Sequence, residues 1–147
     1  MKIMKIGKEQ IKYLCMILFG ANISSIVLGI LHNVIGLHIV IGTIFSIIIV
    51  LSWILNSFLI IFSDFKIVKN SPKGKKMNRL GYGFLGIQIM AIFLLVGGLF
   101  LLNANWFSPL LHHSLILIGF FSFFIYGSVF SYLNIKAVDN REVWKFE

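Results

Sequence analysis

GLHIVIGTIFSIIIVLSWILNSFLIIF, residues 36–62, is the stretch that decides the fold. It carries no formal charge, and as a helix with a rise of about 1.5 Å per residue it is long enough to cross a bilayer. Steps of three and four residues place six positions on one helical face: His38, Gly42, Phe45, Ile49, Ser52 and Asn56. Because this stripe is partly polar, we expect it to face protein, a cavity or a bound group rather than lipid.

The composition of the whole chain is typical of a membrane protein. Of its 147 residues, 59% are hydrophobic and only 12% are charged, and the mean hydropathy is +0.95. Soluble domains carry about a quarter charged residues, so a water-soluble core is not expected. Cys15 is the single cysteine, which excludes an internal disulfide and any all-cysteine metal or iron–sulfur site. The sequence contains no phosphate loop or paired carboxylates, so hydrolytic and phosphoryl-transfer chemistry has no support.

Three further apolar runs of similar length predict an all-α, antiparallel four-helix membrane bundle with up-down-up-down order. We expect one domain over residues 1–147, embedded in the lipid bilayer, with helices over residues 11–32, 36–63, 79–102 and 110–134. A hydrophilic loop is expected over residues 64–79, because Pro72 and Gly74 disfavour a helix there. The charged tail, residues 135–147, is expected to lie at the surface.

The distribution of charge predicts the orientation in the membrane. All 13 Lys and Arg lie in residues 1–12, in the loop 64–79 or in the tail 135–147, and the two short connections carry no charge. By the positive-inside rule, we expect a multi-pass protein of the cell membrane with both termini in the cytoplasm and both short connections outside. This topology explains the net charge of +8, so nucleic acid is not an expected partner.

Four histidines lie at helix ends that are expected on the outer side. His32 ends the first expected helix, His38 opens the second, and His112 and His113 open the fourth. The segment from Lys12 to His32 measures roughly 30 Å as a helix, which is one hydrocarbon thickness. A single histidine at such a boundary is more commonly a residue whose ring reaches water. Their grouping at one depth on three helices nevertheless favours a metal or haem site.

Two imidazoles on facing helices are a standard way to hold a haem iron inside a bundle. Gly42, one turn from His38, and Gly119, two turns from His112, would leave space for a flat macrocycle beside its ligands. Apolar walls are expected from three aromatic side chains: Phe45, Phe123 and Tyr126. Alternatively, three or four of the imidazoles bind a transition metal, Zn²⁺ or copper, without haem.

The order LHxxxG, apolar run, LN in LHIVIGTIFSIIIVLSWILN, residues 37–56, resembles the four-helix b-type cytochromes of bacterial membranes and the bacterial membrane domains related to them. The second hairpin repeats the layout loosely, from His113 through an apolar run to a second Leu-Asn pair. The resemblance implies an electron-transfer protein in which His38 and either His113 or His112 hold an outer haem b.

The same resemblance implies at most one haem. The family usually carries a further histidine about four turns deeper on each of these two helices, for an inner haem. Ser52 and Gly127 stand at the matching positions of this chain, so a second haem is not expected. His32 would lie beside the single haem or serve as an alternative ligand.

A second hypothesis makes the protein a non-catalytic accessory subunit of a larger membrane complex, or a homo-oligomer. The small size, the uncharged connections and the glycine-rich third run suit docking between helices. In either case, we expect three polar side chains to form interhelical hydrogen bonds: Ser52, Asn56 and Gln88.

Overall fold

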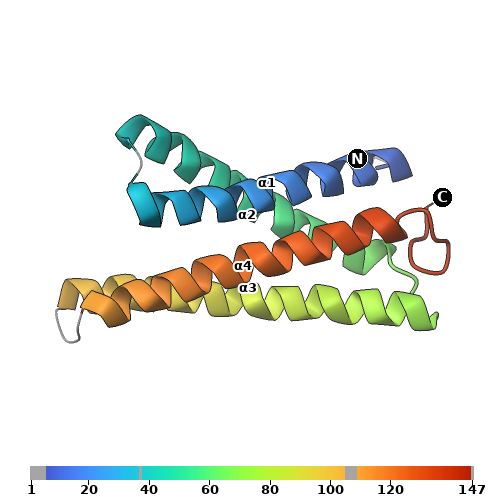
Figure 1. Ribbon diagram of the computed structural model, residues 1–147. Helices are drawn as coiled ribbons and strands as arrows, with labels where there is room; N and C mark the ends of the chain where they lie inside the picture. The colour runs from blue at the N-terminus through green and yellow to red at the C-terminus, as the bar shows by residue number, and fades with distance from the viewer. Residues whose placement is uncertain (1–5, 37, 105–108, 147) are drawn as a thin grey trace, which may run out of the picture.

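The computed structural model describes residues 6–36, 38–104 and 109–146, and within them the chain forms four α-helices (Figure 1). They are α1 (Lys8–Ile35), α2 (Ile39–Lys66), α3 (Pro72–Ala104) and α4 (Pro109–Ala137). All four are long and apolar enough to cross a membrane. The prediction of an all-α chain with four membrane-spanning helices is therefore confirmed.

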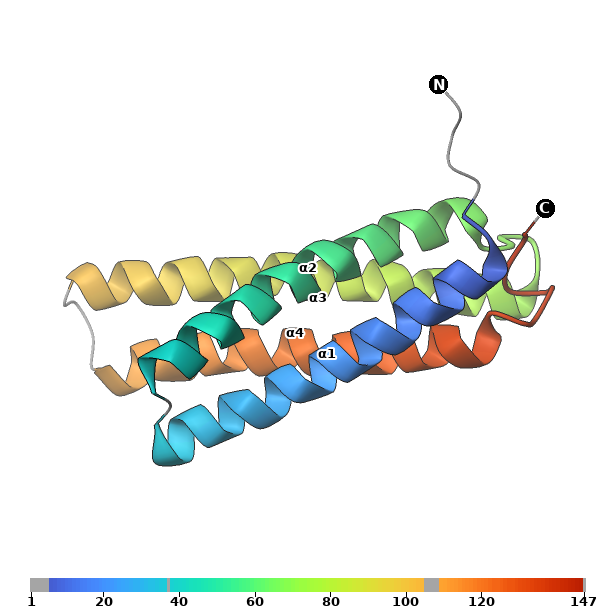
Figure 2. The ribbon, with the colours of Figure 1, turned by 90° about the horizontal axis from the view of Figure 1, so that it is seen from above.

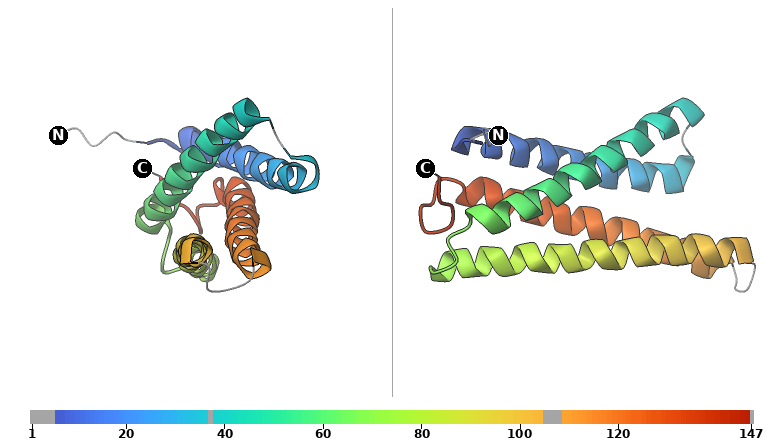
Figure 3. Two further views of the ribbon diagram at one scale, coloured as in Figure 1. Left: turned by 90° about the vertical axis from the view of Figure 1, so that its left-hand side faces the viewer. Right: turned by 180° about the vertical axis from the view of Figure 1, so that it is seen from behind.

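The helices pack as two antiparallel pairs that diverge toward one end. α3 and α4 lie side by side along their length, α1 packs on α4, and α2 crosses α1 and α3 obliquely (Figures 1 and 2). At the terminal end, which holds the start of α1, the α2–α3 loop and the C-terminal segment, all four helices lie close together. At the opposite hairpin end, the tips of α1 and α2 stand apart from those of α3 and α4 (Figure 3).

An aromatic cluster forms the core of the bundle. Phe84 of α3 lies between Phe123 and Phe130 of α4, with ring centroids 5.4 and 5.5 Å apart, and all three side chains are fully buried. Lipid tails are as apolar as these rings, so in a bilayer the cluster stabilises the bundle through close packing rather than through removal from water.

The polar stripe of α2 meets Asn22 of α1 in the middle of the bundle. The amide groups of Asn22 and Asn56 exchange two hydrogen bonds, of 3.2 and 2.9 Å, and both side chains are fully buried. Asn56 also donates to the carbonyl oxygen of Ser52 at 2.7 Å, and Gln88 of α3 donates to the hydroxyl of Ser57. The interhelical hydrogen bonds expected of Asn56 and Gln88 are therefore confirmed. Ser52 instead takes part in a bond within α2, in which its backbone carbonyl accepts the Asn56 amide.

The third helix begins earlier than the sequence predicted. It starts at Pro72, and the loop before it contains only residues 67–71. Proline is well suited to the first turn of a helix, where its missing N–H is not needed, and the Ser71 hydroxyl accepts the Gly74 N–H at 2.9 Å as an N-cap. The expectation that Pro72 and Gly74 prevent a helix is therefore wrong, because these residues stand at its start.

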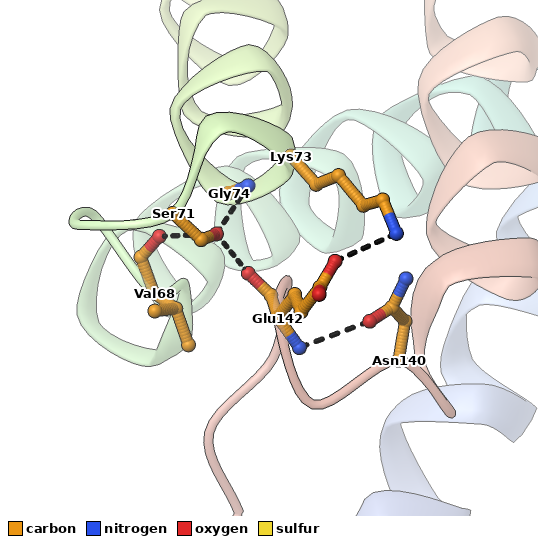
Figure 4. Close-up of polar contacts among 6 residues, drawn as sticks. All are labelled: Val68, Ser71, Lys73, Gly74, Asn140 and Glu142. Carbon is orange, nitrogen blue, oxygen red and sulfur yellow. Dashed lines mark hydrogen bonds and ion pairs between the residues drawn. The ribbon is translucent and has the colours of Figure 1, made fainter.

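The C-terminal segment is not a free surface tail. Its backbone pairs with the α2–α3 loop, since Val68 N donates to Val143 O at 2.8 Å and Lys145 N donates to Lys66 O at 2.9 Å. Figure 4 shows two further links, from the Ser71 hydroxyl to the Glu142 carbonyl and from Lys73 to the Glu142 carboxylate, the latter at 2.6 Å. Trp144 is buried at 2% exposure, which corrects the expectation of a surface tail.

Candidate functional site

A pocket of about 440 Å³ opens between α1, α2 and α4 near the hairpin end. We call it the histidine pocket. Its lining residues come from all three helices: Gly29, His32, Asn33, Phe45, Ile49, His113, Ile116, Leu117 and Phe120. Pockets of this size suit a small molecule or a prosthetic group, and a mostly apolar wall with a few polar groups is typical of them.

Two of the four histidines, His32 and His113, line this pocket from different helices. His32 lies in the last turn of α1, which ends where Gly36 adopts a φ of +69° and donates its N–H to the His32 carbonyl. His113 lies in the first turns of α4, after Pro109. Both side chains are exposed enough to contact a bound group.

His38 and His112 lie outside the histidine pocket. His38 is the exposed N-cap of α2, where its Nδ1 accepts the Val40 N–H at 3.4 Å. His112 is only 2% exposed, and neither ring nitrogen has a hydrogen-bond partner among the described residues. It lies two turns from Gly119, on the α4 face that packs on α3. The structure thus groups His113, rather than His112, with a histidine of another helix.

Of the five residues expected to surround a macrocycle, Phe45 lines the histidine pocket, where its ring lies 6.0 Å from that of Phe120. Gly42 is half-buried, and a Cβ added there would have no neighbour within 4 Å. A Cβ at Gly119 would lie 3.2 Å from the Ala91 carbonyl oxygen of α3. The missing side chain at Gly119 therefore lets α4 lie close against α3.

The other two expected wall residues belong to the core. Phe123 is fully buried, with its ring 4.7 Å from that of Trp53, and Tyr126 stacks on Phe84 at 5.7 Å. Apart from His113, the α4 wall of the pocket was missed at the sequence level. Its signal is the helical spacing of His113, Ile116, Leu117 and Phe120, and that face is hard to recognise because α4 is apolar on every side.

The pocket offers two imidazoles, and within residues 6–36, 38–104 and 109–146 no group of three or more His, Cys, Asp or Glu is placed to hold a metal ion. A zinc site takes three or four protein ligands, whereas two axial imidazoles complete the coordination of a haem iron. In ligand number and apolar lining, the pocket therefore suits haem better than a bare metal ion. Asn33 is the polar neutral side chain in the lining, and its Nδ2 donates to the Gly29 carbonyl at 2.8 Å.

Comparison of the chain with models of protein families, with curated proteins and with solved structures finds no match.

Proposed function

We propose that this protein is a small membrane electron-transfer protein that holds one haem b in the histidine pocket, between His32 of α1 and His113 of α4. The observation that carries the proposal is the pair of imidazoles from different helices lining one apolar pocket. His32 thereby takes the place that the sequence resemblance gave to His38. A haem bound there would supply one-electron chemistry, and its axial ligands would tune the potential.

The chain's own residues have distinct roles in this proposal. His32 and His113 would ligate the iron, and the rings of Phe45 and Phe120 would exclude water from it and keep the local dielectric low. Phe120 packs on Gly29, where an added Cβ would lie 2.7 Å from the Phe120 Cε1. Phe120 and Gly29 together thus close one side of the pocket.

A single haem is also what the packing of the bundle allows. Ser52 is only 2% exposed, and a Cβ added at Gly127 would lie 2.9 Å from the Asn22 amide nitrogen. The bundle is therefore filled by side chains at the two positions that an inner haem would need. We infer electron exchange at one face of the membrane rather than relay across it.

The test is the absorption spectrum of protein purified after expression with abundant haem. We expect a Soret band corresponding to about one haem per chain, its loss in His32→Ala and in His113→Ala, and its retention in the matched control His38→Ala. A colourless wild-type protein contradicts the proposal, and so does a Soret band that survives in both pocket variants. Metal analysis of the same samples detects the haem-free alternative, in which a transition metal copurifies without a Soret band.

We further propose that the terminal end faces the cytoplasm of the cell membrane. Support comes from the Lys and Arg residues of the described segments, all of which lie on the terminal side of the apolar spans. Cys15 is buried and is the only cysteine, so a Cys15→Ser chain suits labelling with a membrane-impermeant maleimide. Asn33→Cys should react in intact cells and Asn70→Cys only after permeabilisation; the reverse pattern contradicts this orientation.

A second candidate role, as an accessory subunit or homo-oligomer, is favoured by the loose packing of α2. This helix contacts both of its neighbours over short stretches, and its apolar side chains near the hairpin end, such as Ile39 and Val40, are mostly exposed. A second helix docked on this face would cover them. Crosslinking in native membranes that yields only the monomer contradicts this role.

A further inference from the structure

A second pocket, of about 460 Å³, lies at the terminal end between the start of α1 and the C-terminal segment. We call it the terminal pocket, and its chemistry is independent of the proposed haem. Three cations and two aromatic rings dominate its lining, which comprises Lys8, Val138, Asp139, Arg141, Trp144, Lys145 and Phe146.

Hydrogen bonds hold the C-terminal side of the terminal pocket in a defined shape. The Asn140 carbonyl accepts the N–H groups of Val143 and Trp144, both at 3.0 Å. Figure 4 shows the Asn140 side chain, which accepts the Glu142 N–H at 2.9 Å. Lys145 is fixed by its backbone bond to Lys66. The backbone that carries the Arg141 and Lys145 side chains is therefore held in place by hydrogen bonds.

The terminal pocket carries an excess of positive charge. Its one carboxylate, Asp139, forms ion pairs with Lys8 at 2.5 Å and with Lys12 at 3.8 Å. Neither Arg141 nor Lys145 has an ion-pair partner within the part of the chain that the structure describes. Cations that converge without a counter-charge create a local potential that attracts anions.

Trp144 provides an independent sign of a missing acceptor. Its indole ring is 2% exposed and stacks on Phe146, with centroids 5.5 Å apart and planes 9° from parallel. The indole Nε1–H is buried and finds no acceptor among the described residues. A buried indole N–H is a donor only and usually has a partner. Trp144 is among the residues that line the terminal pocket, so a ligand with oxygen acceptors bound there is the partner that we infer for this N–H.

We propose that the terminal pocket binds a phosphate group, carried either by an anionic lipid or by a free phosphate. The Arg141 guanidinium presents paired donors that match phosphate oxygens, and Lys8 and Lys145 add point charges. The pocket also lies where the apolar span of α1 begins, after Lys8 and Lys12, which is the depth of lipid headgroups.

The experiment measures binding to the purified full-length chain in neutral detergent at physiological salt. The probes are dihexanoyl phosphatidic acid, dihexanoyl phosphatidylcholine and inorganic phosphate. The test variant Arg141→Gln, Lys145→Gln should bind phosphatidic acid about thirtyfold more weakly, since each cation near an anionic headgroup strengthens binding about fivefold. The matched control is Lys75→Gln, Lys76→Gln, which removes the same charge from exposed residues outside the pocket. It should change binding less than about twofold, because salt screens distant charges.

The probes distinguish the two sources of phosphate. Binding of phosphatidic acid without competition from inorganic phosphate identifies a lipid headgroup, whereas equal binding of inorganic phosphate identifies a free anion. Trp144→Phe, which keeps the stacked ring and removes the N–H donor, should weaken binding several-fold. Equal losses in the test and control variants overturn the proposal, as does unchanged binding in the test variant when both variants elute and melt like the wild type.

Discussion

Replacing Asn56 with alanine should lower the free energy of unfolding by about 1–2 kcal/mol. Asn56 and Asn22 exchange two hydrogen bonds across the α1–α2 contact, and both side chains are fully buried. An interhelical hydrogen bond in a membrane protein contributes about 0.6 kcal/mol on average, so the two account for about 1.2 kcal/mol. The remainder comes from the Asn22 amide, which loses its partner where water does not reach it. Asn22→Ala should cost a similar amount.

The assay is equilibrium unfolding in mixed micelles with an increasing fraction of denaturing detergent, followed by circular dichroism. The matched control is Asn33→Ala, because the exposed Asn33 amide bonds only to the Gly29 carbonyl of its own helix. The double variant Asn22→Ala, Asn56→Ala should cost little more than either single one, which gives a coupling energy of about 1 kcal/mol. Single variants as stable as the control, or two losses that simply add, would refute a stabilising role for the amide pair.

Two further outcomes are expected from single sites. Gly119→Leu should destabilise the bundle by about 1–3 kcal/mol, because a Cβ there would already lie 3.2 Å from the Ala91 carbonyl oxygen. The control Gly42→Leu, where an added Cβ has no neighbour within 4 Å, should change stability by less than about 0.5 kcal/mol. Equal losses in the two variants would contradict the packing argument. The hydrogen bond from Lys8 holds the pKa of Asp139 below its ordinary value of 3.8, so the ion pair stabilises the fold above that pH and is lost as the pH falls below it. The difference in melting temperature between the wild type and Asp139→Asn should therefore shrink toward zero on acidification, and a difference that grows would contradict this linkage.

The sequence predicts the number and type of the helices because four apolar runs of membrane length are separated by charge or by turn residues. It places the ends of the helices less well. An apolar run ends where charged residues begin, whereas a helix can continue through charged residues. The start of α3 illustrates this, because Pro72, Lys73 and Gly74 look like loop residues but form a capped first turn. The burial of Trp144 depends on pairing with the distant α2–α3 loop, which no local pattern predicts.

The candidate site could be predicted only in part, because it depends on rotations and crossing angles of helices. Neighbouring residues of a helix point about 100° apart, so the rotation of α4 decides whether His112 or His113 faces α1. In the structure Gly119 lies close to α3, which places His112 on the same side, and the evenly apolar surface of α4 gives no sign of this rotation. Whether His32 or His38 lies near His113 depends in turn on the divergence of the α1–α2 hairpin from α4.

The amide pair and the histidine pocket belong to one α1–α2 interface. Asn22 lies two turns from Gly29 along α1, and Asn56 lies two turns from Ile49 along α2, so the pair stands about 10 Å deeper in the bundle than the pocket wall. Because α1 and α2 run antiparallel, seven residues forward from Asn22 and seven residues back from Asn56 lead in the same direction. Gly29 and Ile49 therefore lie at the same level of the bundle. The buried amides join α1 and α2; on the hairpin side of this contact α1 still packs on α4 at Gly29 and Phe120, and only the tips of α1 and α2 stand apart from those of α3 and α4 (Figure 3). The pocket lined by His32 and His113 thus lies on the hairpin side of the buried amide pair, about two helical turns away from it.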